Sequence, residues 1–283
     1  MERKTVSERV FEEYLSKRGL DPRYEERPSG ITRPVDYSLE LGGKTIRFDV
    51  KEWEHKGPPM GAGAFDPYEP IREKIQEGRE KFKQYKGRGE PCVLVLCNYG
   101  PQLIMLDAMT IFGAMRGNVG FCFPFDTETG VGDTSRTDLT FLEGGRMVHH
   151  TPSGTVRLQN TTISAIAVLE LINIRARRIG VEFRKRKLDA GRPFTIDESV
   201  AVLEELDSQY QTVQTDHRVI LHDNLDAPVV AVPAEFPSGP YDERFGGDGT
   251  HLIRSYVGSG LAAIEKEESS VGIKPDDPLG LRR

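Results

Sequence analysis

The segment spanning residues 33–51 constrains the fold more than any other part of the chain. Polar and apolar residues alternate along two runs, and Gly42-Gly43 separates them. Two adjacent glycines form a favoured hairpin turn because both central residues can adopt positive φ. With that turn, Leu41 lies opposite Lys44, which sets the register of both runs. The segment is therefore predicted to be an antiparallel β-hairpin.

One face of this hairpin is expected to be apolar. In the predicted register, the opposed apolar pairs are Val35 with Val50, Tyr37 with Phe48, and Leu39 with Ile46. Side chains alternate between the two faces of a strand, so these pairs share one face, as a half-buried sheet requires. We expect the protein core beneath this face.

The other face of the hairpin carries charge. Asp36 is expected directly opposite Asp49, with Lys51 two residues further along on the same side. Opposed Cβ atoms lie about 4.5–5.5 Å apart, and like charges at that distance destabilise a sheet. A divalent cation would compensate, since Mg²⁺ typically binds one or two carboxylates together with water and phosphate. The alternative is a solvated face on which the acids form surface ion pairs, which contribute little.

Pro34-x-Asp36 followed by Asp49-x-Lys51 resembles the motif of the PD-(D/E)XK nuclease superfamily, which has the restriction-endonuclease-like fold. The resemblance implies that Asp36 and Asp49 bind Mg²⁺, for which Mn²⁺ can substitute. It also implies that Lys51 orients or activates the attacking water and that the backbone carbonyl of Val50 is a further metal ligand. One departure from the motif is the residue that separates Pro34 from Asp36.

The resemblance extends from residue 5 to residue 125. The order expected there is helix, hairpin, helix, buried strand, helix and strand, which matches the α/β core of that fold. We therefore expect a three-layer α-β-α arrangement with a mixed central sheet. Residues 1–125 would form the nuclease-like core. Residues 126–283 would form an α+β C-terminal extension, which packs on the core or belongs to the same domain.

An amphipathic helix is predicted between Thr5 and Arg18, because apolar residues recur at helical spacing and Gly19 can end the helix. Superfamily members often carry a Glu on such a helix that completes the metal site. By resemblance this role falls on Glu8. A solvated surface charge is the alternative interpretation of Glu8.

A second helix is predicted from Pro70, since proline favours the first turn of a helix. Apolar residues from Ile71 to Phe82 recur at helical spacing and indicate a face packed on the core. In the superfamily, the corresponding helix presents Lys or Gln towards the site or towards DNA. By resemblance the candidates are Lys81 and Gln84, with ordinary solvated helix side chains as the alternative.

The remaining elements follow from shorter patterns. Residues 91–97 form a continuous apolar run, typical of a strand buried on both faces. Asp107 is placed to cap a helix that reaches Met115. Residues 119–125 are expected to form a strand and residues 126–146 a long loop or excursion. For the apolar stretch within residues 160–173, the spacing of apolar residues does not decide between helix and strand.

A basic cluster follows that stretch. Its members are Arg175, Arg177, Arg178, Arg184, Lys185, Arg186 and Lys187. Such a cluster can neutralise phosphates and would bind nucleic acid. The alternative is a solvated run of charge on a helix, and the sequence does not decide between the two.

Composition and charge bear on which classes of protein the chain can belong to. The net charge of −6 gives no global indication of nucleic-acid binding, although a local patch can coexist with it. No apolar run approaches the roughly 20 residues that a membrane helix needs, and the N-terminus does not resemble a signal peptide. Cys92, Cys97 and Cys122 form no CxxC pattern and are expected to be reduced thiols. We expect a cytoplasmic protein without a membrane span.

The leading prediction is a Mg²⁺-dependent nuclease, a phosphodiesterase acting on DNA or RNA. By resemblance it would be a DNA endonuclease of restriction or defence, repair, or recombination, as a single chain, a homodimer or a larger assembly. A non-catalytic nucleic-acid-binding or assembly module of the same fold is the alternative. A small-molecule enzyme is a third hypothesis, and the sequence contains no nucleotide-binding fingerprint that would favour it.

Overall fold

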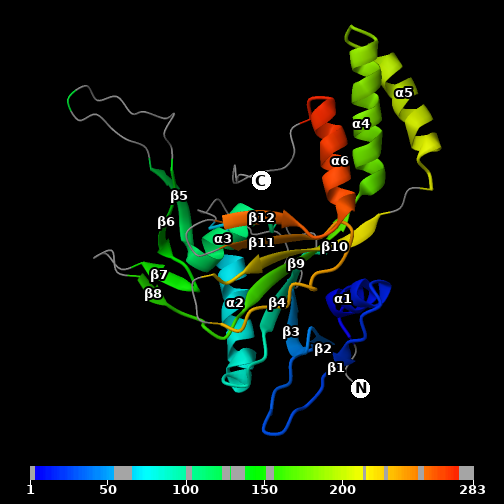
Figure 1. The fold of residues 1–283 in the computed structure, drawn as a ribbon. Coiled ribbons are helices and arrows are strands. Elements are labelled where there is room, and N and C mark those ends of the chain that lie inside the picture. Colours follow the sequence, from blue (N-terminus) through cyan, green and yellow to red (C-terminus); the bar gives the residue numbers. More distant parts are fainter. Residues whose placement is uncertain are drawn as a thin grey trace, which may run out of the picture.

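The computed structural model describes residues 4–53, 66–99, 104–122, 128, 138–150, 156–212, 215–225, 229–247 and 252–273. These residues build a mixed sheet of eight strands in the order β1-β2-β3-β4-β9-β10-β11-β12 (Figure 1). The strands are β1 (Arg23–Tyr24), β2 (Tyr37–Leu41), β3 (Lys44–Glu52), β4 (Cys92–Cys97), β9 (Ala165–Ile172), β10 (Asp216–Asp223), β11 (Glu243–Gly247) and β12 (Leu252–Tyr256). Within the sheet, β3, β4 and β9 run parallel, as do β10 and β11, and the other neighbours are antiparallel.

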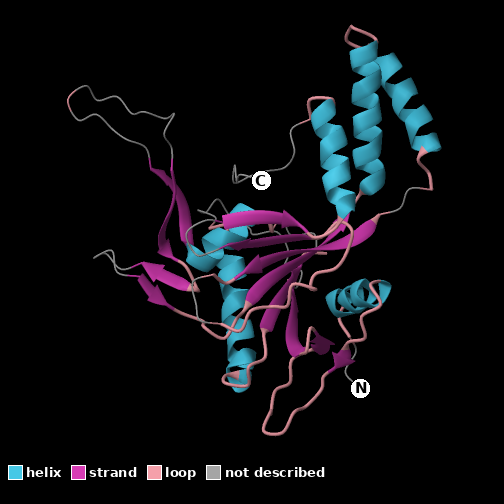
Figure 2. Ribbon diagram, in the orientation of Figure 1, coloured by secondary structure: helices cyan, strands magenta, loops and turns pink. Residues whose placement is uncertain are grey.

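Helices cover both faces of this sheet, which gives a three-layer α/β arrangement. The helices are α1 (Val6–Lys17), α2 (Glu69–Phe82), α3 (Ala108–Arg116), α4 (Ile174–Asp189), α5 (Ile196–Gln209) and α6 (Ser259–Ser270), and α2 continues into the short 3-10 turn η1 (Lys83–Tyr85). Figure 2 shows α1 and α2 on opposite sides of the strands. Two small pairs lie outside the main sheet, β5 (Gly117–Cys122) with β6 (Asp138–Gly144) and β7 (Val148–His150) with β8 (Val156–Leu158).

The two faces of the sheet carry separate apolar cores. Successive residues of β4 alternate between them, because side chains of a strand point to opposite faces. Val93 and Val95 join the core beneath α1, whereas Leu94 and Leu96 join the core beneath α2 and α3. All six residues of β4 are buried, which confirms the prediction of a strand buried on both faces.

The hairpin has the predicted register. Leu41 pairs with Lys44 and Tyr37 with Phe48, and both turn glycines, Gly42 and Gly43, have positive φ. Val35 is an exception, because it belongs to the core beneath α2 rather than to the face that it was expected to share with Tyr37. The physical reason is that β2 begins only at Tyr37, so the alternation of a strand does not extend to Val35.

The other helices and strands can be compared with the remaining predictions from the sequence. Asp107 caps α3 by accepting a hydrogen bond from the amide of Thr110 at 3.1 Å, as predicted. The ambiguous stretch at residues 160–173 contains strand β9, which lies between β4 and β10. The prediction of a loop throughout residues 126–146 is wrong for β6, which pairs with β5. Within the described part of the chain, no helix is both long and apolar enough to cross a membrane.

The sheet is continuous across the boundary expected after residue 125. Strands β1–β4 precede that position and strands β9–β12 follow it, and β4 pairs directly with β9. The later part of the chain therefore completes the central sheet. It also supplies α4, α5 and α6, which rise together from one end of the sheet (Figure 1).

Gly78 lets α2 approach the sheet closely. A Cβ atom at this position would lie 2.8 Å from Leu94 Cδ1 and 3.7 Å from Asp49 Oδ2. The first distance is shorter than van der Waals contact, so a larger side chain would push α2 away from β3 and β4. The missing side chain thus sets the distance between α2 and the charged face of the hairpin.

Replacing Gly78 with valine is expected to lower the free energy of unfolding by about 1–3 kcal/mol through overpacking. Gly180→Val in α4 is the matched control, because nothing lies within 4 Å of a Cβ built there. Valine has a somewhat higher helix propensity than glycine, so the control should be neutral or slightly stabilising. Urea unfolding measures both, and equal effects of the two variants would contradict this packing role.

Candidate metal-binding site

The charged face of the hairpin lies against α2. On β3, residues of one parity point towards the core beneath α1, as Phe48 and Val50 do. Asp49 and Lys51 have the opposite parity and therefore point to the α2 side of the sheet. Asp49 is completely buried there, with 0% of its surface exposed. A buried carboxylate requires compensating partners, because an unpaired buried charge is costly.

The Asp36 side chain also lies on the α2 side of the sheet, but not through the strand pairing that was predicted. It was expected to pair with Asp49 in the β-ladder, but the ladder ends at Tyr37. Its Oδ2 atom instead accepts a hydrogen bond from the backbone amide of Val50 at 2.6 Å. The side chain thereby replaces the backbone acceptor that a longer strand would have supplied.

Lys81 of α2 joins the two carboxylates. Its Nζ atom lies 2.7 Å from Asp36 Oδ1 and 2.6 Å from Asp49 Oδ1. Lys51 Nζ lies 3.0 Å from the other oxygen of Asp49, Oδ2. The hairpin and α2 thus bring two carboxylates and two ammonium groups together, including all three residues of the predicted catalytic motif.

The charges in this cluster perturb one another. Burial, and then the negative charge of Asp36, raise the pKa of Asp49 to about 6, although Lys51 and Lys81 act in the opposite direction. Burial alone would lower the pKa of Lys81, but Asp49 and Asp36 outweigh it and raise that pKa above its usual value. Lys81 therefore remains an ammonium ion at neutral pH.

The oxygen atoms of the cluster fit a hard divalent cation. One oxygen from Asp36 and one from Asp49 already converge on a single positively charged atom. Asp49 Oδ2 is buried and accepts no hydrogen bond, and its negative charge is paired with Lys51 Nζ at 3.0 Å. The amide of Val50 points towards Asp36, and its carbonyl points to the same side, because the two groups of a strand residue do so.

The number of candidate protein ligands for such a cation is small. Among the described residues, no group of three or more His, Cys, Asp or Glu side chains is arranged to hold a metal ion. Mg²⁺ commonly uses only one or two carboxylates and completes its coordination with water and phosphate. Asp36, Asp49 and the Val50 carbonyl therefore suit a cation that shares its coordination sphere with a substrate.

A cavity of about 460 Å³ opens beside Asp36 and Lys81. Its lining also contains Thr5, Glu8, Tyr24, Glu25, Arg27, Arg33 and Pro34. Glu8 thus lies in the predicted region, but its carboxylate accepts a hydrogen bond from the Thr5 amide at 2.6 Å and caps α1. Its role as a metal ligand stays a prediction.

Arg27 and Arg33 were not predicted from the sequence as residues of the site. Both are exposed, and neither forms an ion pair within the described residues. The available signal was their position in the basic segment just before Asp36. The side of the hairpin that they occupy depends on the path of the loop, which the sequence pattern does not give.

Gln84 has a positioning role in the structure. Its Oε1 atom accepts hydrogen bonds from the amides of Thr32 and Arg33 at 2.9 and 3.2 Å. Its amide nitrogen donates to the Arg33 carbonyl at 3.2 Å. These bonds tie the loop before the hairpin to η1, which continues α2, and contact of Gln84 with nucleic acid stays a prediction.

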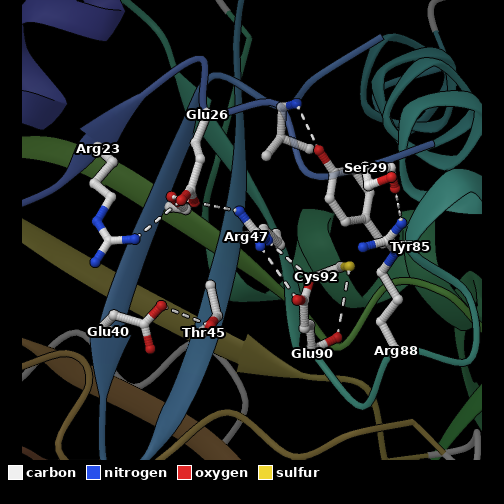
Figure 3. A network of polar contacts seen from close by, with 12 residues as sticks. Arg23, Glu26, Ser29, Glu40, Thr45, Arg47, Tyr85, Arg88, Glu90 and Cys92 are labelled. Carbon is white, nitrogen blue, oxygen red and sulfur yellow. Dashed lines mark hydrogen bonds and ion pairs between the residues drawn. The ribbon is translucent and has the colours of Figure 1, made fainter. Parts of the chain in front are cut away.

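A network of polar contacts around the buried Arg47 lies next to the site (Figure 3). Arg47 lies two residues before Asp49 on the same face of β3 and is only 4% exposed. It binds Glu26 at 2.9 Å and Glu90 at 2.8 Å, and its guanidinium lies over the Tyr85 ring. The network therefore ties the segment before β2 and the segment before β4 to β3.

The basic cluster lies on α4 and is used largely within the protein. Arg177 pairs with Glu268 of α6 at 2.5 Å, Arg175 with Asp207 of α5 at 2.6 Å, and Arg186 with Glu205 of α5 at 2.8 Å. None of the seven cluster residues lines the cavity beside Asp36. Their binding to nucleic acid stays a prediction, but three of them hold α5 and α6 against α4.

The raised pKa of Asp49 predicts that cation binding depends on pH. A proton and a divalent cation compete for this carboxylate, so protonation below about pH 6 weakens binding. The Kd for Mn²⁺, measured by isothermal titration calorimetry, should be nearly constant above about pH 7 and approach a tenfold rise per pH unit below about pH 5. Equal Kd values across this range would contradict the assignment, and Asp49→Asn should bind weakly throughout.

Comparison with known proteins identifies no relative: no protein-family model, no curated protein and no solved structure matches this chain. The chemistry of the site is therefore inferred from its own residues.

Proposed function

We propose that this protein is a metal-dependent nuclease that hydrolyses phosphodiester bonds, with DNA as its substrate. The observation that carries the proposal is the convergence of Asp36, Asp49 and Lys51 beside a cavity lined by two exposed arginines, Arg27 and Arg33. Paired carboxylates next to a lysine suit a metal ion and a nucleophilic water, and the arginines suit phosphate. The mixed sheet between α1 and α2 supports a restriction-endonuclease-like core of the PD-(D/E)XK type.

In this proposal Asp36, Asp49 and the Val50 carbonyl hold Mg²⁺ or Mn²⁺. When bound, the cation polarises the scissile phosphate and lowers the pKa of a water ligand. The Lys51 ammonium, 3.0 Å from Asp49 Oδ2, orients the attacking water and stabilises the negative charge that develops on the phosphate. Burial of Asp49 reduces solvent screening, so these charges act strongly on the reacting group.

Local charge reconciles this function with the net charge of −6. Arg27 and Arg33 line the cavity and form no ion pair within the described residues, so their charge is available to an incoming anion. A guanidinium can bind phosphate through two parallel hydrogen bonds. We therefore assign to them the phosphates next to the scissile bond.

Removal of the Asp49 charge, or of the Lys51 ammonium group, is expected to slow DNA cleavage strongly. Asp49→Asn keeps the size of the side chain but removes its charge, and Lys51→Met removes the ammonium group. Each should lower the rate of Mg²⁺-dependent DNA cleavage by about 10²–10³-fold or more, since groups that stabilise developing charge contribute on this scale. The measurement is cleavage of linear, branched and single-stranded DNA, and of RNA, with Mg²⁺ or Mn²⁺.

Asp21→Asn, at an exposed position outside the cavity, is the control and should cleave like wild type. Wild-type activity of Asp49→Asn would contradict the assignment of the site. Binding of DNA without cleavage in either metal would favour the non-catalytic module of the same fold.

Substitution of the cavity arginines is expected to weaken DNA binding. Arg27→Ala and Arg33→Ala, each made together with Asp49→Asn to prevent cleavage, should both raise the Kd for a short DNA. Each should also reduce the slope of log K against log salt concentration by about 0.9, the value for loss of one phosphate contact. Arg9→Ala, an exposed arginine of α1 outside the cavity, is the control. An unchanged slope in both variants would rule out these phosphate contacts.

A further inference from the structure

The position between Asp36 and Asp49 is filled by an internal cation. Lys81 Nζ contacts one oxygen of each carboxylate at 2.7 and 2.6 Å, which are short distances for charged hydrogen bonds. These are the same two oxygens that would converge on a divalent ion. An ammonium group and a metal ion cannot occupy this position together.

The fold needs a positive charge at this position when no metal is present. Lys51 contacts Asp49 Oδ2 and leaves the Oδ1 atoms of both carboxylates to Lys81. Without Lys81, the charge of Asp36 would face that of Asp49, which is fully buried. Two carboxylates that share a buried site without a cation repel each other strongly.

Lys81 can also leave this position without movement of its helix. Its side chain is 21% exposed, and it lines the cavity that contains Arg27 and Arg33. Lysine carries its charge on a flexible stem of four carbons. Gly78 fixes α2 against Leu94 one turn earlier, so the stem can move while the helix stays in place.

We infer that Lys81 is an exchangeable occupant of the metal position: it holds Asp36 and Asp49 together in the metal-free protein and is displaced by the divalent ion. The inference rests on the proposed metal-dependent function and adds a mechanism by which the site stays assembled before metal binds. Binding exchanges one cation for another, so the carboxylates are never left uncompensated. The displaced ammonium moves into the cavity, where a phosphate group would be bound.

This exchange predicts effects of opposite sign on stability and on metal affinity. Lys81→Met removes the competing charge and should lower the Kd for Mn²⁺ by about tenfold or more in calorimetry, a difference well outside error. The same variant without metal should unfold at a temperature about 4 °C or more below wild type. Saturating Mn²⁺ should then raise its unfolding temperature by more than it raises that of wild type.

Lys74→Met is the matched control. Lys74 lies on the same helix, its side chain is 18% exposed, and it forms an ion pair with Glu77 at 3.0 Å away from the site. This variant carries the same change of net charge and should keep the wild-type Kd within about twofold, a shift of less than half a kcal/mol. If Lys81→Met does not fold, Lys81→Gln, which keeps a hydrogen-bond donor without the charge, provides the same comparison.

The outcomes separate this inference from the nuclease proposal. A lysine with only a structural role would make Lys81→Met bind Mn²⁺ as weakly as wild type or more weakly, while Asp49→Asn still weakens binding. That result would overturn the exchange and leave the metal-dependent function standing. Absence of Mn²⁺ binding in both wild type and the folded Lys81 variant would overturn both.

Discussion

The structure depends on the compensation of two neighbouring carboxylates beneath α2. Asp49 is completely buried and Asp36 nearly so, and two ammonium groups neutralise them. Buried charge is tolerated only when it is paired, because desolvation of an isolated ion costs several kcal/mol. The absence of a side chain at Gly78 brings α2, and with it Lys81, within reach of the hairpin. Fold and site are therefore linked by one electrostatic requirement.

Much of the hairpin could be predicted from the sequence, and its limits have a clear cause. The two glycines and the alternation of side chains determine the register between Tyr37 and Phe48. Neither signal shows where the ladder ends. The Val50 amide bonds to the side chain of Asp36 instead of a backbone carbonyl, and Val35, which lies outside the ladder, packs in the other core. Side chains can replace backbone partners in this way wherever the local geometry permits.

Contacts between distant segments were harder to anticipate. By resemblance, either Lys81 or Gln84 could face the site, and the structure gives Lys81 the carboxylates and Gln84 the preceding loop. The sequence left the role of the basic cluster open, because partners such as Glu268 lie far away along the chain. Such pairings arise when helices pack, so periodicity within one helix does not reveal them. The same holds for the loop that brings Arg33 to the cavity.

A crystal grown with Mn²⁺ tests the central claim most directly, through the anomalous signal of the metal. We predict a peak within coordination distance of Asp36 Oδ1 and Asp49 Oδ1, with the Lys81 ammonium moved away from both. A structure at saturating Mn²⁺ in which Lys81 still bridges the two carboxylates, and no anomalous peak lies beside them, would contradict the account.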